Sequence, residues 1–264
     1  MQPIEEGKAI ALALHEAEQH QAPIAPLSET YPSLTSEQAY AIQNEWQKIK
    51  SSGGSQSPRL VGHKIGLTSL AMQQLLGVDQ PDYGFLLDTM MVQAGSTLAR
   101  SSFIAPRIEP EIAFWLAEDV QGPGVTAAAV LAATRGVSAA LELVDSRIVG
   151  WRIKLVDTIA DNASSARVIV SEDVIAPDKL DLADEGVTLW RNGEIAGKGN
   201  GAAVLGQPAE AVAWLANKLA EFKVGLKAGQ LILPGAMCAA ATVSTGETYH
   251  ADFTHLGPVT IHFG

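Results

Sequence analysis

The chain is poor in cysteine and has no long apolar run, and each shortage excludes a class of protein. Its one cysteine, Cys238, cannot form an internal disulfide or a zinc–thiolate cluster. We interpret it as a buried core residue and not as a nucleophile, because no histidine lies near it in the sequence. No apolar run approaches the roughly 20 residues of a membrane span, and residues 1–18 lack the basic start of a secretory signal. The sequence therefore predicts a cytoplasmic protein.

Basic residues are also scarce, with 18 Lys and Arg against 29 Asp and Glu and a net charge of −11. Nucleic-acid binding requires a basic face, and no cluster of lysine and arginine is present. The 264 residues are 47% apolar and 18% charged, which suits one folded α/β-sized unit with a large core. Because the net charge is negative, an anionic substrate would need a local positive centre, such as a metal ion or a lysine.

The hydrophobic pattern places helices first and strands afterwards. Residues 5–20 and 35–50 have helical periodicity, and the Ser- and Gly-rich loop 51–58 follows them. We therefore place an N-terminal helical lobe at 1–58 and a strand-rich domain at 59–264. Further helices are expected at 69–76, 126–134 and 209–221. Strands are expected at 60–67, 108–116, 137–144, 167–170, 187–191, 230–233, 240–244, 248–253 and 259–263, with a hairpin turn at Asn192-Gly193.

Few of these strands are joined by crossover helices, so the order predicts an α+β fold with a rolled sheet, mixed or largely antiparallel. It does not suit a Rossmann fold or a TIM barrel, and neither a G-x-G-x-x-G motif nor a P-loop is present.

The segment 107–114 carries two glutamates with strand spacing. Glu109 and Glu111 are two residues apart, so a strand projects both from one face. Two such carboxylates repel unless one is protonated or a cation lies between them. Pro110 cannot donate a ladder hydrogen bond, which predicts an edge or bulged strand. The alternative is an ordinary solvent-facing strand with two free glutamates.

A third glutamate, Glu142, lies inside the apolar run 139–144. A buried carboxylate is costly unless it is paired, hydrogen-bonded or metal-bound. An ion pair with Arg107 or Arg147 is therefore the alternative to a metal. If Glu109, Glu111 and Glu142 do meet, three carboxylates without histidine or cysteine suit Mg²⁺, Mn²⁺ or Ca²⁺ better than zinc.

Other polar residues have two interpretations each. Lys64 is flanked by strand-like apolar residues and is either a partly buried cation or a surface lysine. Asp82 lies in the predicted loop 79–84 as a base or as a turn residue. The polar cluster 161–165 is either a helix cap or a ligand loop. Three basic residues also have two interpretations: each either binds a distal carboxylate of the substrate or, as we prefer, forms a structural ion pair. They are Arg107, Arg147 and Lys154.

Taken together, five motifs in order resemble one family along nearly the whole chain. They are residues 62–69 (GHKIGLTS), 80–84 (QPDYG), 106–113 (PRIEPEIA), 141–147 (LELVDSR) and 157–164 (DTIADNAS). The chain resembles the 2-oxopent-4-enoate (2-hydroxypentadienoate) hydratases and 4-oxalocrotonate decarboxylases. This group belongs to the fumarylacetoacetate hydrolase superfamily and acts in meta-cleavage catabolism of aromatic compounds.

The resemblance implies a rolled mixed sheet with an N-terminal helical lobe and homo-oligomers built from dimers. It implies Mg²⁺ or Mn²⁺ on Glu109, Glu111 and Glu142, and a small 2-oxo acid as substrate. The residues beside that substrate would be Lys64 and Asp82 in the chemistry and Lys64, Leu67, Arg107 and Ser164 in binding. The hydrolases of the superfamily use a histidine-centred group with no placed equivalent here, which disfavours C–C bond hydrolysis.

Within this group we predict the hydratase reaction, in which 2-hydroxypenta-2,4-dienoate gives 4-hydroxy-2-oxopentanoate through a metal-stabilised enolate and water addition at C4. Asp82 or a metal-ordered water is the candidate for proton transfer. Residues 122–126, 145–148 and Trp151 favour the hydratase, whereas 162–165 and 201–206 favour a 4-oxalocrotonate decarboxylase with the same metal site. Because the two enzymes form complexes, a non-catalytic partner subunit is a third alternative.

Overall fold

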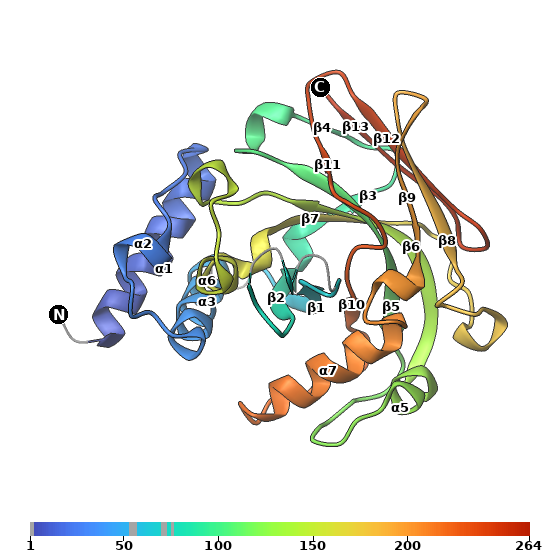
Figure 1. Ribbon diagram of the computed structural model, residues 1–264, viewed down its shortest axis with the longest axis horizontal. Helices are drawn as coiled ribbons and strands as arrows, with labels where there is room; N and C mark the ends of the chain where they lie inside the picture. Colours follow the sequence, from blue (N-terminus) through green and yellow to red (C-terminus); the bar gives the residue numbers. More distant parts are fainter. Residues whose placement is uncertain (1–2, 53–56, 70–72, 75–76) are drawn as a thin grey trace.

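A strongly curved mixed sheet forms the centre of the molecule, and helices flank it on two sides (Figure 1). The computed structural model describes residues 3–52, 57–69, 73–74 and 77–264. Helices α1, α2, α3 and α6 gather at one end, and α5 and α7 lie at the other. Their bounds are α1 (Pro3–His20), α2 (Leu27–Thr30), α3 (Ser36–Lys50), α5 (Ala127–Ala132), α6 (Leu155–Ala160) and α7 (Pro208–Ala220).

Eight strands of the described residues form the central sheet, in the order β2-β1-β10-β5-β6-β7-β3, with β11 also paired to β5. The pairs β1–β10 and β3–β7 are parallel and the other pairs are antiparallel. The strands are β1 (Leu60–Gly66), β2 (Asp82–Leu87), β3 (Met91–Gln93), β5 (Arg107–Leu116), β6 (Thr134–Val144), β7 (Ser165–Val170), β10 (Leu231–Leu233) and β11 (Ala241–Thr242). The predicted α+β fold with a rolled mixed sheet is confirmed.

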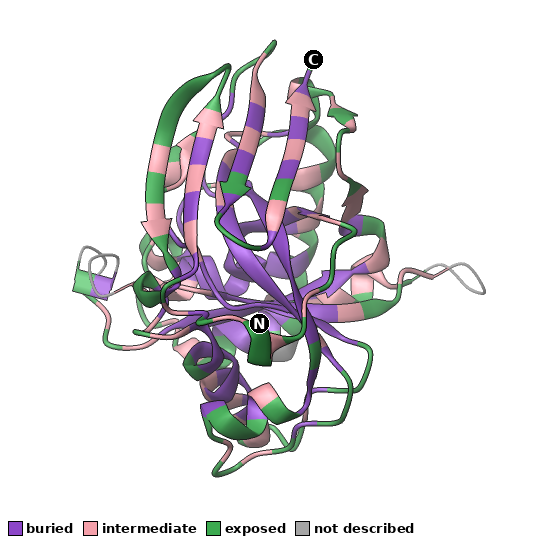
Figure 2. Cartoon of the chain, turned by 90° about the vertical axis from the view of Figure 1, so that its right-hand side faces the viewer, coloured by how far each residue is buried: buried purple, intermediate pink, exposed green. Residues whose placement is uncertain are grey.

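A second sheet of five described strands covers one side of the first, in the order β4-β13-β12-β8-β9. Its strands are β4 (Thr97–Leu98), β8 (Gly186–Arg191), β9 (Glu194–Asn200), β12 (Thr248–Phe253) and β13 (Gly257–Phe263). Along β8, β12 and β13, buried residues alternate with intermediate or exposed ones (Figure 2). The buried ones join α1, α3, α7 and the central sheet in one hydrophobic cluster, so the second sheet closes the core on that side.

Helix α3 shows how the sequence determines the helical end. Thr35 accepts a hydrogen bond from the backbone N–H of Gln38, whose side chain accepts one from the backbone N–H of Thr35, which forms a capping box. The expected apolar face is buried and includes Ile42 and Trp46. Trp46 belongs to the same hydrophobic cluster as the central sheet. The domain boundary at residue 58 stays a prediction.

Several expected elements differ from the structure. Asp82 lies at the start of strand β2 and not in a loop, so the expected loop was wrong. Nothing in the sequence pattern indicated this strand, because residues 82–87 are buried on both faces and lack the alternation that marks a half-buried strand. The expected helix 69–76 lies partly outside the described residues. The expected strand 240–244 is reduced to β11 (Ala241–Thr242). None of the helices in the described part of the chain combines the length and apolar character that a membrane crossing requires.

Pro110 lies in the interior of the sheet, so the prediction of an edge strand was wrong, and the register shift of β5 against β6 lies at Trp115/Leu116, away from Pro110. Strand β5 is flanked by β6 on one side and by β10 and β11 on the other. The C=O of Pro110 accepts from Met237 N at 2.9 Å, in the loop between β10 and β11. In an antiparallel ladder the N and C=O of one residue point to the same side. The missing N–H therefore faces that irregular loop, where no ladder hydrogen bond is required.

Candidate metal centre

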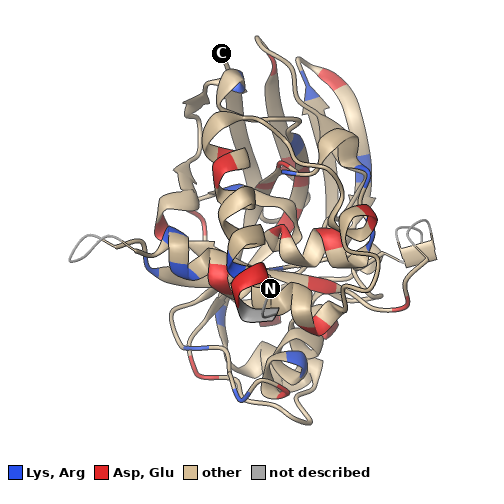
Figure 3. Cartoon of the chain, turned by 90° about the vertical axis from the view of Figure 1, so that its left-hand side faces the viewer, with Lys and Arg blue, Asp and Glu red and all other residues tan. Residues whose placement is uncertain are grey.

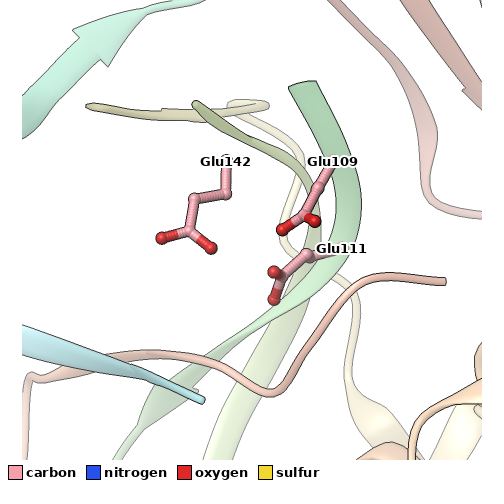
Figure 4. Close-up of side chains that lie close together, drawn as sticks. All are labelled: Glu109, Glu111 and Glu142. Atoms are coloured by element: carbon pink, nitrogen blue, oxygen red, sulfur yellow. The ribbon is translucent and has the colours of Figure 1, made fainter. Parts of the chain in front are cut away.

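Three glutamates converge on one point of the curved sheet. Glu109 of β5 stands directly opposite Glu142 of β6, and Glu111 lies two residues further along β5 on the same face. Each glutamate offers one oxygen, and these oxygens lie within 4.8 Å of one another. Figure 4 shows the three carboxylates pointing into the same space. Strand parity predicted that Glu109 and Glu111 converge, and the β5–β6 register adds Glu142.

Two of these carboxylates are shielded from solvent and the third is partly shielded. Glu111 and Glu142 are fully buried, and Glu109 is half-buried. Glu111 Oε2 accepts from Gly235 N at 2.8 Å, whereas Glu111 Oε1 and Glu142 Oε1 have no hydrogen-bond partner among the described residues. Burial raises the pKa of Glu109 to about 7 and that of Glu111 well above its usual range, and the charge of Glu142 adds to both effects. Orphaned, buried carboxylate oxygens of this kind fit a hard divalent cation.

Lys64 supplies the positive charge beside this cluster. Its Nζ lies 3.2 Å from Glu142 Oε2 and donates to the backbone oxygen of Ala163 at 3.0 Å. Burial lowers the pKa of Lys64, but Glu142 and the other nearby carboxylates outweigh burial and raise the pKa above its usual value. The cation paired with Glu142 is thus a lysine and neither of the two arginines considered from the sequence.

Asp82 stands next to Lys64. It pairs with Gly66 across β1–β2, where a Cβ on Gly66 would lie 2.3 Å from Asp82 Oδ1 and 3.4 Å from Lys64 Nζ. Asp82 Oδ2 accepts from Thr158 Oγ1 at 2.8 Å, and Oδ1 has no partner among the described residues. Burial raises the pKa of Asp82, and Lys64 partly offsets this effect. The site therefore holds a fourth carboxylate with a free oxygen.

The other candidate binding residues differ in whether their polar groups already have a hydrogen-bond or ion-pair partner. Leu67 directly follows β1, and its C=O accepts from Gln73 Nε2 at 2.8 Å. Ser164 is buried and its hydroxyl donates to Asp161 Oδ2 at 3.1 Å. Arg107 lies on the same face of β5 as Glu109. Its guanidinium lies 4.2 Å from the ring centre of Trp151, and no carboxylate of the described residues is within ion-pair distance.

The remaining basic residues have structural or exposed positions. Arg147 is fully buried and forms an ion pair with Asp161 at 2.5 Å, which is the structural role preferred for it from the sequence. Lys154 is exposed just before α6. Cys238 is half-buried and not a core residue, because it sits on the loop beside β9, where its sulfur approaches Gly197.

Two features of the site were not assigned from the sequence. Thr158 lies within the motif 157–164, but nothing in the pattern connects it with Asp82, which is 76 residues away. The N–H of Gly235 that binds Glu111 is a backbone group, and no side-chain motif signals it. Both contacts depend on how the chain packs.

The rolled sheet thus holds a carboxylate-lined site of three clustered glutamates with a buried lysine and a buried aspartate beside them, and its oxygen atoms could hold a hard divalent cation. Residues 67–263 match the family described as fumarylacetoacetate (FAA) hydrolase C-terminal. The chain belongs to this family.

Similar proteins of known activity cover almost the whole chain. The chain is 44% identical to the 2-oxo-hept-4-ene-1,7-dioate hydratase of Escherichia coli over 96% of each protein. It is 42% identical to the 2-hydroxyhexa-2,4-dienoate hydratase of Comamonas testosteroni, over 95% of the chain and 94% of the relative. Its structure is similar to that of the 4-oxalocrotonate decarboxylase of Pseudomonas putida G7 complexed with magnesium and adipate. That comparison has a TM-score of 0.95 and 36% identity over 98% of each chain.

Proposed function

We propose that this chain is a metal-dependent hydro-lyase that hydrates 2-hydroxypenta-2,4-dienoate to 4-hydroxy-2-oxopentanoate in meta-cleavage aromatic catabolism. The observation that carries the proposal is the cluster of Glu109, Glu111 and Glu142 with Lys64 and Asp82 beside it. Hydratases at 42–44% identity support the reaction class. Their names cover substrates of different chain length, so the five-carbon acid is our choice within this class.

The three glutamates would hold Mg²⁺ or Mn²⁺. The donor set is all oxygen, which these ions prefer, and the related decarboxylase was solved with magnesium in one case and calcium in another. When bound, the ion would supply positive charge for the negative charge that gathers on the 2-oxo group during the reaction. With three glutamates at −3, Asp82 at −1, Lys64 at +1 and the ion at +2, the site sums to −1.

Lys64 would hold the substrate carboxylate. An ammonium group has three N–H donors. One donates to Ala163 and one faces Glu142, and no described residue occupies the third. The buried position keeps water away from this charge, so its attraction for an anion is stronger than that of a surface lysine. Leu67 and Ser164 would line the same space as non-ionic contacts.

Asp82 would move the protons. Hydration requires a proton to arrive at C5 as the dienol becomes the conjugated ketone, and water then delivers its hydroxyl to C4 and a proton to C3. The free Oδ1 of Asp82 is the protein oxygen beside Lys64 that can hold and return such a proton. Burial raises the pKa of Asp82 above its usual value, so this carboxylate takes up a proton more readily than an exposed aspartate.

Arg107 would contact the end of the substrate furthest from the metal. It is two residues from Glu109 on the same face, and it forms no ion pair with a carboxylate of the described residues. Stacking on Trp151 fixes the plane of the guanidinium. Replacing Arg107 with Met should therefore lower kcat/KM more for a seven-carbon dioic substrate than for the five-carbon monoacid. Equal loss on both would contradict contact with a distal carboxylate.

Two assays test the function. Wild-type protein should turn over 2-hydroxypenta-2,4-dienoate, followed by loss of dienoate absorbance, and should release no carbon dioxide from 4-oxalocrotonate. Release of carbon dioxide without dienoate turnover would instead favour the decarboxylase, which the structural neighbour makes the second candidate.

Metal analysis tests the third alternative, a non-catalytic partner subunit. Glu109→Gln should bind less Mg²⁺ than the wild type and lose activity in proportion. Unchanged metal content and activity in this variant would overturn the metal assignment. We further propose homo-oligomers built from dimers and a complex with the cognate decarboxylase, as the family resemblance implies, and light scattering of the chain alone and mixed with the decarboxylase measures both.

A further inference from the structure

The segment 157–164 contacts both charged residues that flank the cluster of three glutamates, Lys64 and Asp82. Thr158, in α6, donates its hydroxyl to Asp82 Oδ2 at 2.8 Å. The backbone oxygen of Ala163, in the turn after α6, accepts from Lys64 Nζ at 3.0 Å. In the proposed function Ser164, at the end of this segment, lines the substrate space, but Thr158 has no role. Of the segment's two contacts, the one from Thr158 can be removed by changing a side chain.

We propose that Thr158 is the positioning residue for Asp82: its hydroxyl holds Oδ2 and thereby keeps Oδ1 turned toward Lys64 and the reacting carbons. This inference rests on the proposed function, in which Asp82 moves protons. Asp82 Oδ1 and Lys64 Nζ both lie within 3.4 Å of the point where a Cβ on Gly66 would stand, so Oδ1 is on the lysine side of the carboxylate.

The contact is needed because a carboxylate does not orient itself. The terminal torsion of aspartate has a broad, roughly two-fold energy profile, so the side chain turns easily unless one oxygen is held. In this site Oδ1 has no partner among the described residues. Among the side chains of the described residues, Thr158 is the one that donates a hydrogen bond to this carboxylate, and its hydroxyl thereby fixes the carboxylate plane.

The backbone on both sides of this contact is clamped. Gln43 Nε2, which is buried, donates to Tyr83 O at 2.8 Å and to Ile159 O at 2.7 Å. Tyr83 follows Asp82 and Ile159 follows Thr158, so one amide group joins the two residues next to the contact. The Thr158–Asp82 distance is therefore held by the fold, and the hydroxyl acts on a carboxylate whose backbone cannot drift.

The test removes the hydroxyl without changing the volume of the side chain. Thr158→Val is nearly isosteric, Thr158→Ser keeps the hydroxyl, and Thr134→Val is the matched control. Thr134 is also buried and donates to a single acceptor, Val130 O at 2.7 Å, but it lies at the start of β6, away from the glutamates. Thr158→Val and Thr134→Val should lower the melting temperature by similar amounts.

Two readouts separate positioning from general damage. In steady state, Thr158→Val should lose kcat roughly 10- to 100-fold with KM nearly unchanged, because the substrate still binds but proton transfer is misaligned. The second readout is exchange of the C3 hydrogens of 2-oxopentanoate in heavy water with Mg²⁺, followed by NMR, which needs neither hydration nor decarboxylation. It should slow by a similar factor in Thr158→Val, recover in Thr158→Ser and stay unchanged in Thr134→Val.

The outcomes distinguish this inference from the function on which it rests. If wild-type protein neither exchanges the C3 hydrogens nor turns over the dienoate, the proposed function and the inference both fail. If wild-type protein exchanges them and Thr158→Val exchanges them equally fast, only the positioning role fails. Loss of exchange in Thr158→Ser as large as in Thr158→Val would also overturn it, because the hydroxyl would not then be the group that matters.

Discussion

Lys64 is the residue on which the electrostatics of the site depend, because it is a buried cation among four acidic side chains. Its pKa is raised despite burial, because Glu142 and the other nearby carboxylates favour the charged form, so it is charged near neutral pH. Glu142, which it faces, is fully buried and has one oxygen without a partner among the described residues. Removing the cation would therefore leave an uncompensated negative charge in the interior.

Lys64→Met should accordingly destabilise the metal-free protein by about 3 kcal/mol, the usual cost of breaking a buried ion pair from one side. Mg²⁺ should recover part of this loss, because it would restore positive charge beside Glu142. Urea unfolding with EDTA and with excess Mg²⁺ measures both quantities. An equal loss under the two conditions would show that the metal does not share the charge environment of Lys64.

His63, the neighbour of Lys64, points to the opposite face of β1 and is buried against Tyr83. Burial lowers the pKa of His63 to about 4. The unfolded chain, with a histidine pKa of about 6.5, therefore binds a proton before the folded protein does. His63 thus lowers stability as the pH falls from 6.5 to about 4, and its contribution is fully restored above pH 6.5.

The difference in unfolding free energy between wild type and His63→Gln isolates this effect from other titrating groups. It should change by about 3 kcal/mol between pH 7 and pH 4, in the direction that disfavours the wild type at low pH. Urea unfolding at several pH values measures it. A difference that is constant with pH would mean that His63 has the same pKa in the folded protein as in the unfolded chain.

At the scale of elements, the turn after α6 has unusual backbone geometry. Three consecutive non-glycine residues, 162–164, have φ values of 55°, 48° and 56°, the left-handed region that L-residues rarely adopt. Arg147 holds both ends of this turn, because it binds the carboxylate and the C=O of Asp161 and the C=O of Ser165. Its guanidinium also lies 4.7 Å from the ring centre of Trp46, which connects the turn to α3.

Asp161→Asn should therefore cost about 3 kcal/mol, since it leaves the fully buried Arg147 without its counter-ion. The comparison is Asp178→Asn, whose partner Lys179 forms an exposed ion pair and whose loss should leave stability unchanged. Thermal and urea unfolding of both variants check this. Equal stabilities would contradict the assignment of Arg147 and Asp161 as the anchor of the turn.

Elements with strong local signals were predicted well and elements without them were not. Asn192-Gly193 forms the predicted hairpin turn between β8 and β9, and both residues have positive φ. Strand β2 was missed because both of its faces are buried, so no alternation distinguishes it. Pro110 was misplaced because its missing N–H faces a local gap between two partner strands, a feature of pairing and not of β5 itself.

At the scale of the whole molecule, the excess of acidic residues is spread over the surface and also concentrated at one interior point. Figure 3 shows acidic and basic residues interspersed on the helical side of the molecule. The clustered glutamates are instead in the central sheet, where like charges repel without water to screen them. This repulsion raises the pKa values of Glu109 and Glu111, and a divalent cation would offset it and favour the ionised form of all three glutamates.

Mg²⁺ at about 100 times its dissociation constant should consequently stabilise the protein by about 2.7 kcal/mol, because a ligand that binds only the folded state shifts the unfolding equilibrium. Glu111→Gln should abolish this gain, whereas Glu194→Gln on the exposed strand β9 should retain it. Melting curves with and without Mg²⁺ provide the measurement. A gain that persists in Glu111→Gln would place the ion elsewhere.

The sequence by itself determined the class of fold, the shared face of Glu109 and Glu111 and the need of Glu142 for a partner. These follow from strand parity, hydrophobic periodicity and the cost of burying charge, which act over a few residues. Only the tertiary structure decided that the partner of Glu142 is Lys64, that Arg147 belongs to Asp161 and that Thr158 reaches Asp82. Each of these contacts joins residues from different elements, and strand register and packing, which no local pattern encodes, bring them together.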